Sequence, residues 1–137
     1  MHFRRIRYRY AVLAPNLEPR PLGDVFRTRP PGSLAQAHWR PLADLYEGPD
    51  ALFVKIELSG VGDDEVEVAL YEDTLVVEGE RPWRLPEGVV RFHAVEIPYG
   101  PFRVEVAVPE GLDRESLEAH FERGVLLVRL PKQRGAQ

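Results

Sequence analysis

The sequence predicts an all-β protein, an antiparallel β-sandwich preceded by a flexible arm, from three observations. Short segments in which apolar and polar residues alternate recur between residues 41 and 130. Turn signals rich in Gly, Pro and Asp separate them about every 8–12 residues, as in sandwich proteins. Helical patterning is confined to brief turns. The 137 residues, 44% of them hydrophobic, fit one domain with a core of its own.

The N-terminal arm covers residues 1–40, and we expect it to be partly disordered. Its opening has the period-two pattern of a half-buried strand, with four candidate anchor side chains: Ile6, Tyr8, Tyr10 and Val12. Five prolines then interrupt any regular element, so residues 15–38 are predicted as loop, apart from a short helical turn near residues 34–38.

The sandwich domain is predicted over residues 41–132 and is followed by a short tail, 133–137. Its expected strands are residues 41–47, 51–58, 65–71, 74–80, 102–108, 117–122 and 125–130. In the second of these, Leu52, Val54 and Ile56 share one face, which we assign to the core. Residues 113–116 are expected to form one helical turn, and Pro131 is expected to end the domain.

A longer excursion, residues 81–100, interrupts this rhythm and contains three prolines and two glycines. Within it, residues 89–96 have the β-branched and aromatic composition of a strand.

Charge is unevenly distributed, because a basic arm precedes an acidic body. Residues 1–38 hold seven arginines against Glu18 and Asp24, while the whole chain has a net charge of -4. Such an arm can bind nucleic acid or a membrane surface, or fold back on the acidic body of its own or a neighbouring subunit. We favour the interpretation that the arm folds back on an acidic body, because the longest basic block in the arm is Arg4-Arg5. No bilayer-length apolar run or signal core is present, so we expect a cytoplasmic protein without membrane partners.

Catalytic and metal-binding motifs are not found, so we predict a non-enzymatic protein without cofactors. The four histidines lack metal-ligand spacing, no serine stands in a nucleophile elbow, and cysteine is absent. Gly60-Val61-Gly62 is half a dinucleotide fingerprint outside any βαβ unit, so we interpret it as a turn. The Arg7-Tyr8-Arg9-Tyr10 series could stack on bases, but an amphipathic strand packed on protein explains it as well, and we consider nucleic acid unlikely as a partner.

The last two predicted strands carry the most specific motif in the sequence. The segment Ala119-His120-Phe121-Glu122-Arg123-Gly124-Val125-Leu126 resembles the A-x-x-x-x-G-V-L signature of the small heat-shock protein (α-crystallin) family. The matching signature residues are Ala119, Gly124, Val125 and Leu126. Further matches follow the order of the family at residues 43–47, 58–61, 75–81, 99–102 and 108–111. The resemblance covers residues 41–132 and implies an immunoglobulin-like α-crystallin sandwich.

The resemblance implies an ATP-independent holdase chaperone that binds partly unfolded proteins and prevents their aggregation. It also implies self-association as a dimer or larger oligomer, alone or with a sister small heat-shock protein. In the family, the excursion after the Gly-Glu-Arg strand supplies a strand to a partner subunit. That assigns a dimer contact to Val90, Phe92, Ala94 and Glu96. A groove for a peptide or client would be lined by Val66, Val68, Leu70, Leu117, Ala119 and Phe121.

Two departures from the family pattern qualify these expectations. Residues 132–137 contain no I-x-I motif, which in the family docks in a neighbour's groove. We therefore hypothesise that the arm fills the groove, with its alternating side chains on an added strand. In addition, Val104 stands where the family's strand usually has an arginine, so an apolar contact should replace its ion pairs.

Two other classes of function stay open from the sequence. The same sandwich could serve as a protein-binding adaptor or co-chaperone module with one defined partner. The arginine-rich arm could instead make a nucleic-acid-binding protein, whose binding would fall steeply with salt.

Overall fold

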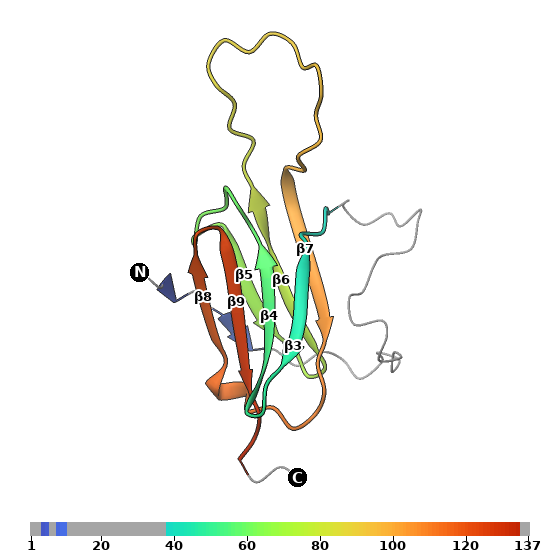
Figure 1. The fold of residues 1–137 in the computed structure, drawn as a ribbon, viewed down its shortest axis with the longest axis vertical. Helices are drawn as coiled ribbons and strands as arrows, with labels where there is room; N and C mark the ends of the chain where they lie inside the picture. Colours follow the sequence, from blue (N-terminus) through green and yellow to red (C-terminus); the bar gives the residue numbers. More distant parts are fainter. Residues whose placement is uncertain (1–3, 6–7, 11–37, 135–137) are drawn as a thin grey trace.

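The computed structural model describes residues 4–5, 8–10 and 38–134, which form two stacked β-sheets (Figure 1). The strands are β1 (Arg4–Arg5), β2 (Tyr8–Tyr10), β3 (Ala43–Glu47), β4 (Ala51–Glu57), β5 (Val66–Leu70), β6 (Thr74–Arg81), β7 (Gly100–Ala107), β8 (Glu118–Glu122) and β9 (Val125–Pro131). One sheet has the order β1-β8-β9-β4-β3 and the other β2-β5-β6-β7. The described residues include a single helical turn, η1 (Arg114–Ser116). The predicted all-β sandwich is therefore confirmed.

The core lies between the two sheets. It is built from every second residue of each strand, the residues whose side chains point inward. In β4, Leu52, Val54 and Ile56 are buried, whereas Lys55 and Glu57 point to solvent. Strands β5, β6, β7 and β9 contribute to the same apolar cluster. Each fully buried Val, Leu or Ile side chain contributes about 1.5–3 kcal/mol of hydrophobic stabilisation. The period-two pattern of the sequence thus determines which face of each strand is buried.

The β8–β9 hairpin is closed by a two-residue turn at Arg123 and Gly124. Both residues have positive φ, 54° and 76°, and Glu122 pairs with Val125 across the turn. This is the geometry of a type I′ turn, whose twist matches that of the flanking strands. The predicted Arg-Gly connection therefore has a conformational reason, because glycine adopts positive φ without strain.

Strands β3 to β9 correspond to the seven predicted strands, with ends that differ by one or two residues. For example, β7 begins at Gly100 because it pairs with Arg81 at the end of β6. Pro131, expected to follow the last strand, is its final residue. The predicted turn at 113–116 is η1, and the turn near residues 34–38 lies almost wholly outside the described residues.

Residues 82–99 form a long loop, the protruding loop, that extends beyond the sandwich between β6 and β7 (Figure 1). The strand expected at residues 89–96 is not formed in the single chain. A strand needs a neighbour to accept and donate its backbone hydrogen bonds, and this segment lies away from both sheets. The expected pairing of this segment as a strand with a partner subunit stays a prediction.

Candidate protein-binding surfaces

The described residues offer no metal site. Within residues 4–5, 8–10 and 38–134, no group of three or more His, Asp or Glu side chains is placed to hold an ion. His93 lies in the protruding loop and His120 in β8. Ser116 Oγ donates a hydrogen bond to Asp113 Oδ2 at 2.7 Å, so a carboxylate, and not a histidine, is its partner.

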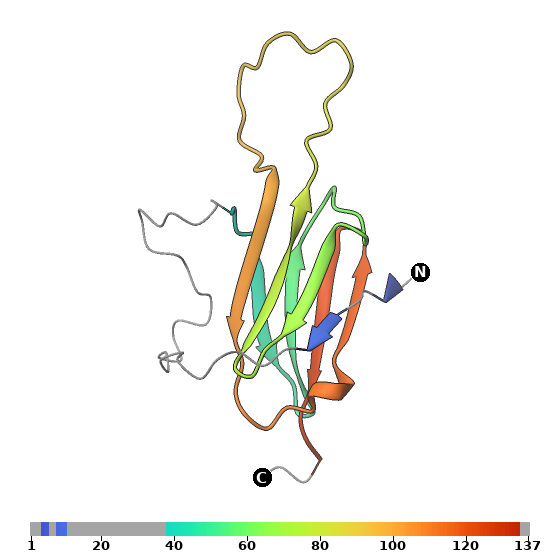
Figure 2. The same cartoon turned by 180° about the vertical axis from the view of Figure 1, so that it is seen from behind.

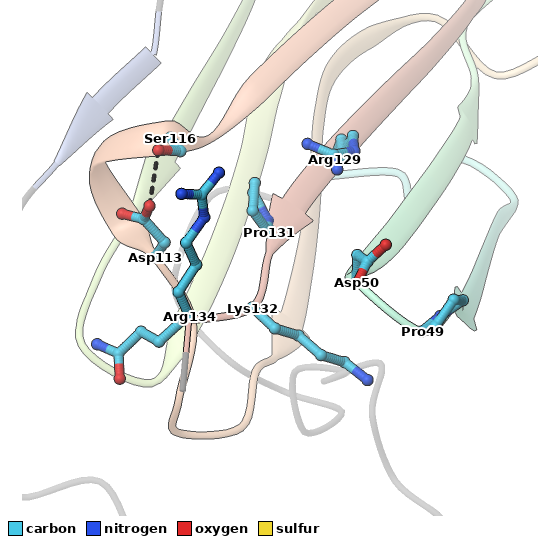
Figure 3. Close-up of a pocket in the computed structure, with 9 residues that line it drawn as sticks. Pro49, Asp50, Asp113, Ser116, Arg129, Pro131, Lys132 and Arg134 are labelled. Atoms are coloured by element: carbon cyan, nitrogen blue, oxygen red, sulfur yellow. Dashed lines mark hydrogen bonds between the residues drawn. The ribbon is translucent and has the colours of Figure 1, made fainter. Parts of the chain in front are cut away.

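A polar hollow of about 1120 Å³ lies at the end of the sandwich where β9 ends (Figure 3). Its lining residues are Pro49, Asp50, Asp113, Ser116, Arg129, Pro131, Lys132, Gln133 and Arg134. Cationic and anionic side chains share this surface, and Lys132 Nζ lies 3.6 Å from Glu47. Its charged lining residues are Asp50 and Asp113 on the one hand and Arg129, Lys132 and Arg134 on the other, which gives a surface of mixed charge.

The arm contributes one short strand to each sheet (Figure 2). Strand β1 pairs antiparallel with β8, with Arg4 opposite Phe121, and β2 pairs parallel with β5, with Tyr8 opposite Val68. These pairings occupy the β8 edge of the five-stranded sheet and the β5 edge of the four-stranded sheet. Two of the proposed arm anchors, Ile6 and Val12, lie outside the described residues.

The six predicted groove residues lie on β5, on β8 and just before β8, beside the arm strands. Five of them belong to the buried core: Val66, Val68, Leu70, Leu117 and Ala119. Phe121 is partly buried and packs against that core. The side chains of these six residues therefore face the interior of the sandwich, while the arm strands pair with the backbone edges of β5 and β8.

The predicted dimer-contact residues lie in the protruding loop and are exposed. Val90 is 97% exposed and Phe92 53%, and Ala94 and Glu96 are exposed as well. The loop also exposes other large apolar side chains, namely Trp83, Leu85, Val89, Val95 and Ile97. Soluble monomers rarely expose so many apolar side chains in one segment, which marks the loop as a candidate interaction surface.

The family signature residues lie in the β8–β9 hairpin. Ala119 and Leu126 are fully buried, and Gly124 accepts a 2.7 Å hydrogen bond from Leu58 N. A Cβ atom at Gly124 would lie 3.0 Å from Ser59 Cα, so this turn packs tightly on the turn after β4. The signature therefore specifies a hairpin and its packing.

Val104, the departure in β7, is fully buried in the core. Its neighbour Arg103 points outward and forms ion pairs with Glu78 at 2.8 Å and Glu105 at 2.7 Å. Burial alone would lower the pKa of Arg103, but the hydrogen bonds and charges of the two glutamates outweigh burial and raise it.

Two residues at the base of the protruding loop were not identified from the sequence as functional. Arg81 is buried beneath the loop, and Trp39 packs against its guanidinium. The only sequence signal was the Gly-Glu-Arg motif immediately before Pro82. A charged residue at a strand end is usually exposed, so its burial could not be anticipated.

The fold and its surfaces define the class: a two-sheet β-sandwich with an exposed apolar loop between two of its strands. The family model for the Hsp20/alpha crystallin family matches residues 44–137, and the chain belongs to this family. No helix among the described residues has the length and hydropathy to span a bilayer.

Related proteins support this assignment. Spore protein SP21 of Stigmatella aurantiaca is 34% identical over 68% of this chain and 55% of its own length. Heat shock protein 16 of Schizosaccharomyces pombe is 33% identical over 78% of this chain and 73% of its own length. The chain thus spans little more than half of the first of these relatives. The structure of hspA from Xanthomonas axonopodis is 30% identical with a TM-score of 0.66, covering 73% of this chain and all of that one.

Proposed function

We propose that this protein is an ATP-independent holdase that binds partly unfolded proteins and keeps them from aggregating. The observation that carries the proposal is the protruding loop, residues 82–99, with its row of exposed apolar side chains. Unfolding clients expose apolar patches and unpaired strands, and such segments bind to apolar surfaces and open strand edges. No step of this mechanism needs nucleotide.

Self-association through the loop is the second part of the proposal. Strand β3 is the outer strand of the five-stranded sheet, and Leu42 beside it is 74% exposed. Residues 89–96 lack a strand neighbour in the single chain. Pairing this segment with β3 of a second copy would satisfy both sets of backbone groups and cover apolar surface at both sites.

Two matched substitutions test this pairing. In a strand, Val90 and Phe92 face one side and Val95 the other. We expect Val90→Asp to shift the protein from oligomer to monomer in light scattering at micromolar concentration, and Val95→Asp to shift it less. Equal effects of the two substitutions would contradict the strand pairing.

Holdase activity is tested by light scattering of a heat-denatured client, without nucleotide. We expect suppression of aggregation at a stoichiometric ratio of subunit to client, unchanged by added ATP. A protein that fails to suppress aggregation but binds one defined partner would support the alternative, an adaptor or co-chaperone module with the same sandwich.

We also propose that the arm protects the β5 and β8 edges in place of a docked tail. The pairings of β1 with β8 and β2 with β5 support this. Removing residues 1–14 should free both edges and raise the oligomer mass measured by light scattering, since free edges pair with other chains. An unchanged mass would refute this role. A cytoplasmic location and co-assembly with a sister chain are further parts of the proposal, tested by fractionation and by mixing labelled chains.

A further inference from the structure

Arg81, the last residue of β6, is 9% exposed although it is charged. Its Nε and Nη2 atoms donate hydrogen bonds to Pro98 O at 2.9 and 2.6 Å, and Nη1 donates to Ser59 O at 3.3 Å. Pro98 lies on the returning stem of the protruding loop, and Ser59 lies in the turn after β4 of the other sheet. The guanidinium therefore joins both stems of the loop to the body of the sandwich.

Aromatic rings enclose the same guanidinium. Arg81 Cζ lies 4.2 Å from the ring centroid of Trp39 and 5.6 Å from that of Tyr99. Trp39 is itself fixed, because its Nε1 donates to Gly100 O at 3.0 Å and its backbone pairs with β7. Among the described residues no carboxylate pairs with Arg81. Carbonyl oxygens and ring faces thus stabilise its charge.

The aromatic contacts continue from this cation to the exposed part of the loop. Tyr99 meets Trp83 edge-on with ring centroids 4.3 Å apart, and Trp83 meets Phe92 edge-on at 5.9 Å. Arg81, Tyr99, Trp83 and Phe92 therefore form a continuous series, which we call the aromatic ladder. It begins at a buried residue and ends within residues 89–96.

We infer that Arg81 is a positioning residue for self-association, holding the protruding loop in one orientation through the aromatic ladder. A loop ordered before association loses less conformational entropy on binding a second copy. Lysine cannot substitute, because its ammonium offers neither the planar fork for Pro98 O nor a stacking face. The inference rests on the proposed self-association through the loop and names the residue that prepares it.

The experiment uses the full chain with Arg81→Met and Arg81→Lys, and Arg84→Met as the matched control. Arg84 lies on the outgoing stem of the loop, three residues after Arg81. Its side chain is 70% exposed and forms a surface ion pair with Glu65 at 2.9 Å. Tyr99→Leu interrupts the aromatic ladder without touching the buried guanidinium bonds, and so tests the inference if Arg81→Met does not fold. The self-association Kd is measured by sedimentation at several concentrations.

We expect the two Arg81 variants and Tyr99→Leu to raise the Kd at least about tenfold, and Arg84→Met to change it less than about twofold. Arg81→Met combined with Tyr99→Leu should raise it little further, because both break the same ladder. A Kd for Arg81→Met equal to that of Arg84→Met would overturn the inference, as would a Tm loss for Arg81→Met without a change in Kd.

A second readout separates this inference from the proposed function. The chain has no cysteine, so a nitroxide attached at His93→Cys labels the loop alone. In dilute monomeric protein, Arg81→Met should increase the mobility of this label and Arg84→Met should not. If the wild-type chain never associates, the proposed self-association fails. The label then decides whether Arg81 orders the loop, and equal mobility in both variants refutes that role.

Discussion

Replacing Gly79 by alanine tests how closely β5 and β6 pack at the edge of the core. Gly79 faces inward in β6, opposite Phe102 of β7 and Val66 of β5. A Cβ atom there would lie 2.0 Å from Glu65 O and 2.8 Å from Phe102 Cζ. The nearer atom belongs to the backbone, so a side-chain rotation cannot relieve this contact.

The loss in free energy of unfolding that Gly79→Ala causes follows from these distances. Ordinary contact for a Cβ begins at 3.4 Å, so Glu65 O must move by about 1.4 Å. That carbonyl accepts a 3.1 Å hydrogen bond from Glu80 N, which this movement would break. Overpacking costs about 1–3 kcal/mol, and the lost bond about 1 kcal/mol. Alanine regains about 0.5–1 kcal/mol of backbone entropy, which leaves a net loss of about 1–3.5 kcal/mol.

Gly48→Ala is the matched control, because a Cβ there would meet no atom closer than Phe53 Cε2, at 3.5 Å. We expect Gly48→Ala to be neutral or to stabilise by up to about 1 kcal/mol. Gly79→Ala should lower the Tm by roughly 4–28 °C for a domain of this size. Both are measured by circular dichroism at one low protein concentration, because association also stabilises. A difference below about 1 kcal/mol between the variants would refute the packing argument.

Three further substitutions probe the turn, the core and the outer face. Gly124→Ala, at φ 76°, should cost about 1–2 kcal/mol, and an unchanged urea midpoint would contradict the required left-handed turn. Leu126→Ala, in the fully buried core, should cost about 2–5 kcal/mol, against less than about 0.5 for the 74% exposed Leu42→Ala. Arg103→Met should cost about 0.5–1 kcal/mol, and most of this loss should vanish in 1 M salt, because the ion pairs are partly exposed. Since the pKa of Arg103 is raised, its contribution is lost only at a pH above the usual pKa of arginine.

The strands and their buried faces followed from the sequence because period-two alternation is a local property of the chain. Leu52, Val54 and Ile56 could be assigned to the core from their spacing alone. The family, too, was carried by an ordered series of short motifs. Strand ends were less certain, as at Gly100, because they depend on a partner far along the chain.

The candidate binding surfaces required the tertiary structure. Residues 89–96 have the composition of a strand but form none, because no neighbouring strand lies beside them in the single chain. The side chains assigned to a groove, such as Val68 and Ala119, are core residues whose strand edges are paired with the arm. Composition alone does not distinguish a residue that lines a groove from one that fills a core.

The sequence by itself determined that this chain is a β-sandwich of the Hsp20/alpha crystallin family, because alternation and turn chemistry are local. Only the tertiary structure decided which strand edges the arm pairs with and where the loop projects. It also placed Arg81 between Trp39 and Tyr99, which are 60 residues apart in the sequence. Such contacts arise from the packing of two sheets, and no local pattern encodes them.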